Sequence, residues 1–114
     1  MDVGSFASEL VRALADAEPF ESVSLDTEGP VASGRVYAGE RTFLQFYFNE
    51  VSGTMAFVLV EGEQRIGGID YDNRRGWHLH PVDCPTDHIP VEALSVREIV
   101  TRLADMVRRK ATSK

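Results

Sequence analysis

The sequence contains a single cysteine among its 114 residues, so no internal disulfide can form. A chain of this length buries enough apolar surface to fold without a disulfide or a structural metal. We therefore expect one domain spanning residues 1–114. A lone thiol is typical of a reducing compartment and favours a cytoplasmic protein.

Long hydrophobic runs are also missing, as is a basic start followed by an apolar segment. A helix that crosses a bilayer needs roughly 20 apolar residues, and a secretory signal needs a basic start ahead of its apolar core. The sequence thus predicts neither a membrane span nor secretion.

Basic residues are few: 12 Lys and Arg stand against 18 Asp and Glu, which gives a net charge of −6. Broad contact with nucleic acid needs clustered cations that neutralise phosphates, so the composition argues against it. Two local clusters remain. The cluster at 108–110 suits the C-terminal end of a helix, whereas Arg74–Arg75 lies beside the histidines and is a candidate phosphate contact.

Apolar spacing predicts a helix near each end of the chain. Apolar residues three and four apart run from residue 3 to 17, before Pro19 would stop the helix. A second stripe covers 96–109. It follows Ser95 and Glu98, whose spacing is that of a capping box.

Between these helices the period changes to two, and short turns interrupt the pattern between residues 20 and 80. Segment 42–48 is rich in aromatic residues, which predicts a central strand. Segment 54–60 is apolar on both faces, which predicts a strand covered on both sides. We expect an α+β fold in which five or six antiparallel strands form a meander, packed by the N- and C-terminal helices. Gly67–Gly68 marks a bulge or a close backbone approach, and residues 81–94 are expected to form a loop.

Most of the chemistry lies in the segment 70–88, which contains all three histidines and the only cysteine. Residues two apart share a face of a strand, so His78 and His80 point the same way. If the apolar residues of the two strands face one core, Tyr71 pairs with Trp77 and Asp70 with His78. This register predicts a carboxylate beside an imidazole on the outward face.

Three interpretations of these residues stay open. In the first, the histidines form structural hydrogen bonds and Cys84 is a small buried side chain. In the second, His78, His80, Cys84 and His88 ligate zinc, because a His-x-His chelate plus Cys and His donors can complete a tetrahedral site.

The third interpretation is catalytic and requires no cofactor. His78 or His80 acts as acid and base, Asp70 orients the imidazole, and Arg74 or Arg75 steadies a phosphate or its transition state. A ribonuclease-type activity would follow from this arrangement.

The segment from Tyr71 to His80 resembles the signature of the TumE-like family of small prokaryotic proteins, which are toxin components of toxin–antitoxin pairs. The matching positions are Asp72, Asn73, His78 and His80. The resemblance implies a cytoplasmic toxin-like protein with a cognate antitoxin as partner and RNA as target. A non-catalytic binding module, dimeric or bound to another protein through a sheet edge or the hairpin that carries Arg74, is the alternative from another class.

Overall fold

The computed structural model describes residues 1–82, 84 and 86–112. Within these residues a seven-stranded antiparallel sheet is flanked by two helices, α1 (Val3–Ala15) and α2 (Val96–Thr112). The strands are β1 (Ser22–Glu28), β2 (Val31–Ala38), β3 (Thr42–Asn49), β4 (Met55–Glu61), β5 (Gln64–Asp72), β6 (Gly76–His80) and β7 (Ile89–Pro90). Each strand pairs with its neighbours along the chain. The predicted α+β meander is confirmed, with one strand more than the upper limit that we expected.

The additional strand is β7, which lies in the segment predicted as a loop. It pairs with β6 through Leu79 opposite Ile89 and His78 opposite Pro90. The helix ends also differ from prediction: α1 stops at Ala15 instead of residue 17, and α2 continues to Thr112 instead of residue 109. Apolar spacing locates a helix well but defines its last turn poorly.

Side chains cap the N-termini of both helices. Asp2 Oδ1 accepts a hydrogen bond from the Ser5 amide at 2.7 Å ahead of α1. Ahead of α2, the Ser95 amide donates to Glu98 Oε1 at 2.9 Å and the Glu98 amide donates to Ser95 Oγ at 3.1 Å. These two bonds confirm the predicted capping box, which satisfies amides that have no partner within the helix.

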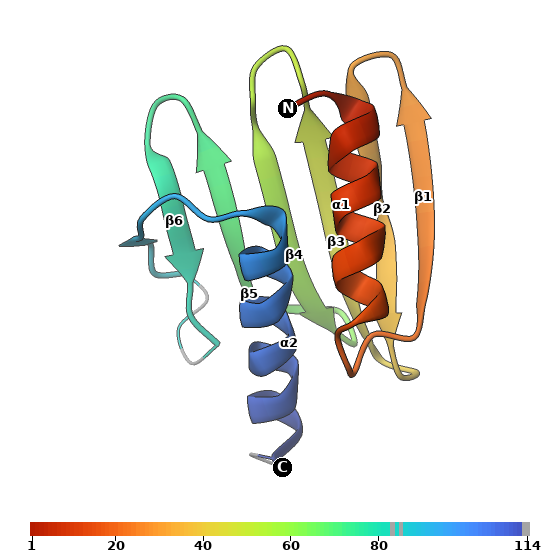
Figure 1. The fold of residues 1–114 in the computed structure, drawn as a ribbon. Coiled ribbons are helices and arrows are strands. Elements are labelled where there is room, and N and C mark those ends of the chain that lie inside the picture. The colour runs from red at the N-terminus through yellow and green to blue at the C-terminus, as the bar shows by residue number, and fades with distance from the viewer. Residues whose placement is uncertain (83, 85, 113–114) are drawn as a thin grey trace.

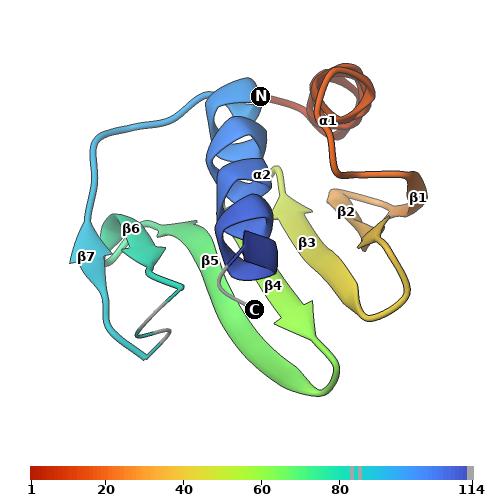
Figure 2. The same ribbon diagram turned by 90° about the horizontal axis from the view of Figure 1, so that it is seen from below.

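Both helices lie on the same side of the sheet (Figure 1), with α1 against β2 and β3 and α2 against β5. The sheet curves around α2, so the helices occupy its concave side (Figure 2). No helix of the described chain covers the opposite face, which we call the helix-free face. The sheet is therefore packed on one side only, and the candidate site lies on the other.

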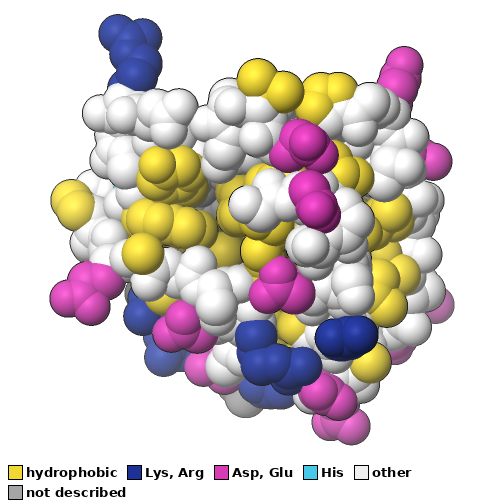
Figure 3. Space-filling view, turned by 45° about the horizontal axis from the view of Figure 1, so that its top comes forward, with side chains coloured by type: hydrophobic (Ala, Val, Ile, Leu, Met, Phe, Trp, Pro, Cys, Tyr) yellow, Lys and Arg dark blue, Asp and Glu magenta, His cyan; other side chains and the backbone are white. Residues whose placement is uncertain are grey.

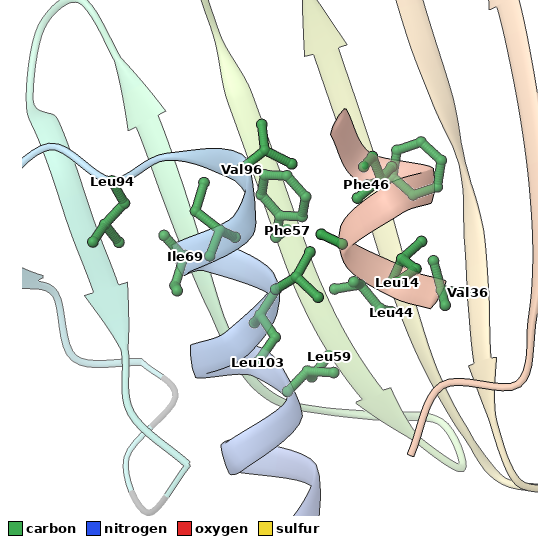
Figure 4. Packing of buried hydrophobic residues seen from close by; sticks show 14 of the residues in the cluster. Leu14, Val36, Leu44, Phe46, Phe57, Leu59, Ile69, Leu94, Val96 and Leu103 are labelled. Carbon is green, nitrogen blue, oxygen red and sulfur yellow. The ribbon is translucent and has the colours of Figure 1, made fainter. Parts of the chain in front are cut away.

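The core fills the space between the sheet and the helices. Phe6 of α1 stacks on Phe48 of β3 with 4.5 Å between ring centroids. Leu103 of α2 lies toward Leu59 and Ile69 of the sheet (Figure 4). Because strand residues alternate between faces, this core fixes which side chains of β4, β5 and β6 point to the helix-free face.

Figure 3 shows acidic side chains scattered between apolar patches, with most of the basic side chains near the bottom of the view and one projecting at the upper left. This distribution agrees with the net charge of −6. Neither described helix combines the length and the apolar character that a membrane crossing requires.

Candidate functional site

The β5–β6 hairpin has the register that the sequence predicted. Asp70 pairs with His78, Tyr71 with Trp77, and Ile69 with Leu79. The Tyr71 and Trp77 rings lie 5.1 Å apart, on the same side as the core residue Ile69. The carboxylate and the imidazoles consequently share the helix-free face.

Asp72 organises the turn between these strands. Its Oδ1 accepts hydrogen bonds from the amides of Arg74 at 2.9 Å and Arg75 at 2.8 Å. The Arg75 guanidinium also pairs with Asp72 Oδ2 at 3.1 Å. The hydrogen bond that the Arg75 backbone amide donates is the main reason why the pKa of Asp72 lies below its ordinary value. Asp72 thus has a structural role at the hairpin tip.

Asn73 connects this tip to the neighbouring turn. Its Nδ2 donates to the carbonyl oxygen of Ser52 at 2.9 Å, and its Oδ1 accepts from the Tyr71 hydroxyl at 3.3 Å. Two of the four positions that carry the family resemblance, Asp72 and Asn73, therefore shape the turns beside the histidines.

The histidines are far less accessible than an outward-facing pair would be. His78 is 3% exposed and His80 is 2% exposed. His80 lies opposite Gly68, which has no side chain to hold the ring away from the sheet. The predicted face is correct, but the expected exposure is wrong, because the glycine and a third histidine enclose the pair.

Asp70 is the common partner of the buried rings. Its Oδ2 accepts a hydrogen bond from His80 Nε2 at 3.0 Å, and the same oxygen lies 3.4 Å from His78 Nε2. The Nδ1 atom of His78 lies 3.3 Å from the carbonyl oxygen of Gly76. Within the part of the chain that the structure describes, two buried side-chain atoms lack a hydrogen-bond partner, Asp70 Oδ1 and His78 Nε2.

Arg65 is a member of this site that the sequence analysis missed. Its Nη2 lies 3.8 Å from Asp70 Oδ2. Strand alternation places residues five apart on opposite faces, but Leu59 pairs with Gly67 while Val60 pairs with Arg65. This β-bulge returns Arg65 to the face of Asp70, in keeping with the frequent occurrence of bulges beside functional sites.

The Gly67–Gly68 pair was the signal that could have revealed this bulge. A Cβ on Gly68 would lie 2.3 Å from the carbonyl oxygen of Phe57 on β4. Both predicted features are present: β4 and β5 approach closely at Gly68, and the register shift lies next to Gly67.

His88 approaches the buried pair from the segment that follows β6. Its ring centroid lies 4.6 Å from that of His80 and 5.4 Å from that of His78. The pKa of His88 is lowered, first by desolvation and then by the neighbouring His80 and His78 rings, with smaller contributions from Arg75 and Arg65. The neutral imidazole is thereby favoured.

The remaining predicted residues take different positions. Among the described residues, the ligand atoms of His78, His80 and His88 lie within 4.8 Å of one another. Cys84 is an exposed free thiol outside this group. Arg74 and Arg75 are both exposed at the hairpin tip, where Arg75 is engaged by Asp72.

A second feature of the helix-free face is an aromatic strip, defined here as Tyr37, Phe43, Tyr47, Val58 and Val60. Phe43 pairs with Tyr37 on one side and with Val60 on the other. The Arg35 guanidinium lies over the Phe43 ring at 4.5 Å. Tyr37 and Tyr47 are each 38% exposed. Val58 pairs with Gly68, so the strip extends to the histidines.

Comparisons with protein-family models, curated proteins and solved structures found no match to this chain.

Proposed function

We propose that the protein is a non-catalytic binding module that holds another protein on the aromatic strip. The observation that carries this proposal is a sheet packed by helices on one face only, whose other face presents aromatic side chains. An antiparallel sheet with one solvated face ordinarily shows polar residues there. The strip departs from this pattern, and Tyr, Phe and Arg are the residue types enriched in interfaces.

The charge of the chain indicates the kind of partner. A net charge of −6 steers a basic surface toward the protein and disfavours the approach of a second copy. Arg35 and Gln45 border the strip and are exposed, which gives its margin hydrogen-bond donors. The partner that fits is a protein with a positively charged surface and an apolar patch within it.

Burial of the histidines favours binding over catalysis. A catalytic imidazole must reach the proton that it transfers. His78 and His80 are 3% and 2% exposed, so an RNA phosphate could not contact them without displacement of the covering segment. The aromatic strip, in contrast, is accessible as it stands.

Site-specific photocrosslinking in the native host tests the proposal. A benzophenone amino acid at Tyr47 is expected to give one discrete adduct with a basic protein, and the same probe at Glu9, exposed on α1, is the matched control. Equal adducts from both positions, no adduct, or an adduct with the chain itself would contradict it.

The dissociation constant of the identified partner then shows how much the aromatic strip contributes to binding. Tyr47→Ala should weaken the dissociation constant by roughly 5- to 30-fold, because a half-buried aromatic side chain contributes about 1–2 kcal/mol to an interface. Val11→Ala removes an exposed apolar side chain on α1 and should leave the affinity unchanged.

A toxin-like function on RNA is the second candidate. The observation that favours it is the hydrogen bond from His80 to Asp70, an arrangement that prepares an imidazole for acid–base chemistry. Arg74 and Arg75 would hold the phosphate, and a cognate antitoxin would bind the protein. Expression in a growing host should then arrest growth, and a doubly substituted His78→Ala/His80→Ala variant that still folds should not. If expression of the wild-type protein does not change the growth of the host, this candidate is excluded.

A further inference from the structure

His78 and Asp70 meet in a buried contact that needs a positive charge, either a second proton on the ring or a bound cation. A carbonyl oxygen only accepts hydrogen bonds, so His78 Nδ1 must donate its proton to Gly76. In the neutral ring Nε2 then carries a lone pair, and it faces the acceptor Asp70 Oδ2 at 3.4 Å. Asp70 Oδ1 is also buried without a partner. Two buried acceptors that face one another are unfavourable unless one of them carries a proton or binds a cation.

The surrounding side chains form a donor set for such a cation. His78, His80 and His88 each offer a ring nitrogen within 4.8 Å of the others. His78 and His80 belong to β6, where His78 pairs with β5 and β7 and His80 pairs with Gly68 of β5. The hydrogen bond between His80 and Asp70 fixes a second ring, as carboxylates commonly do for metal-bound histidines.

We propose that His78, His80 and His88 bind a divalent transition-metal ion, Zn²⁺ foremost, with Asp70 as the carboxylate that orients the His80 ring. Imidazole nitrogens suit Zn²⁺, and three of them leave the fourth tetrahedral position for water or an anion. His78 would coordinate through Nε2, the nitrogen that the Gly76 hydrogen bond leaves as an acceptor.

The geometry identifies His88 as the ligand that moves toward the ion when the metal binds. Zn–N bonds of about 2.0–2.1 Å in a tetrahedral site place the nitrogens about 3.4 Å apart, so the cluster must contract by up to roughly 1.4 Å. His88 is exposed and lies outside the regular strands, whereas His78 and His80 are buried in the sheet. Substitution of His88 therefore removes a ligand with little effect on the core.

The positive charge of Arg65 should weaken metal binding, and removal of this charge provides a second, independent test. Its guanidinium lies 3.8 Å from Asp70 Oδ2, and it competes with a metal for the negative charge of that carboxylate. Arg75 is neutralised by Asp72. Arg65→Gln should consequently strengthen metal binding, a result that a purely structural role for the histidines would not give.

The experiment uses the full chain without a polyhistidine tag, stripped with a chelator and titrated calorimetrically with ZnCl₂. We expect one ion per chain. His88→Gln should weaken the dissociation constant at least tenfold, and Arg65→Gln should tighten it roughly threefold. Cys84→Ala, which removes the exposed thiol between His80 and His88 in the sequence, is the matched control and should bind as the wild type does.

CoCl₂ identifies the donor atoms. The visible bands of tetrahedral Co²⁺ should appear without a thiolate charge-transfer band. Absence of saturable binding, an affinity that is unchanged in His88→Gln, or an unchanged or weakened affinity in Arg65→Gln would overturn the assignment. A thiolate band that Cys84→Ala abolishes would overturn the three-histidine donor set in the same way.

Discussion

Arg65 and Asp70 lie five positions apart on β5, yet their side chains meet on one face of the sheet, with 3.8 Å between Nη2 and Oδ2. In a regular strand this odd spacing would place them on opposite faces. The bulge between the Leu59 and Val60 pairings shifts the alternation by one residue. The bulge thus places the Arg65 guanidinium beside the histidines, and the electrostatic effect of this positive charge can be measured.

The first prediction concerns the pKa of His88 in the metal-free protein. Arg65→Gln and Arg75→Gln should each raise it, because both cations disfavour the imidazolium form. Arg74→Gln removes the adjacent cation, which is not among the causes of the shift, and is the control. A proton NMR titration of the three histidines measures the effect. A His88 pKa that responds equally to Arg74→Gln would contradict the geometry of the turn.

The second prediction concerns the close approach of β4 and β5. Gly68→Ala should destabilise the protein by at least about 2 kcal/mol, because the added Cβ would meet the Phe57 carbonyl oxygen at 2.3 Å. Gly4→Ala is the matched control, since a Cβ there makes only an ordinary contact at 3.6 Å. Urea denaturation gives both free energies of unfolding, and equal values for the two variants would refute the prediction.

A third prediction follows from the lowered pKa of Asp72. A carboxylate whose pKa is lower in the folded state contributes stability above its unfolded pKa, and that contribution disappears as pH falls through the folded pKa. The ordinary value is 3.8, so the loss should occur below that pH. Asp72→Asn keeps the oxygen acceptor but does not titrate.

The stability difference between the wild type and Asp72→Asn should therefore shrink between about pH 6 and about pH 2.5. Urea denaturation at both pH values measures it. A difference that stays constant would mean that the hydrogen bonds from the Arg74 and Arg75 amides do not favour the ionised form.

The fourth prediction tests the attachment of α1 to the sheet. Phe6→Ala should lower the free energy of unfolding by about 3–5 kcal/mol, because it leaves a cavity beside Phe48 in the core. Val11→Ala, on the exposed side of the same helix, should change it by less than about 0.5 kcal/mol. Thermal or chemical denaturation followed by circular dichroism distinguishes the two, and a small effect of Phe6→Ala would mean that α1 is not anchored at this point.

Local patterns in the sequence were sufficient for both helices, for the antiparallel meander and for one strand register, although they did not reveal β7. The helices follow from apolar spacing and from the Ser95 capping box, because those features depend on neighbours within a few residues. The pairing of Asp70 with His78 follows from a short turn and from alternation, since a one-residue shift would turn Trp77 away from the core.

Burial of the histidines and the presence of Arg65 among them were decided only by the tertiary structure. The pattern around His78 and His80 specifies their face, but their exposure depends on how the segment carrying His88 folds over them. Arg65 reaches Asp70 through a bulge whose position is set by the pairing of β4 with β5. Both features arise from contacts between residues distant in sequence, to which local periodicity is insensitive.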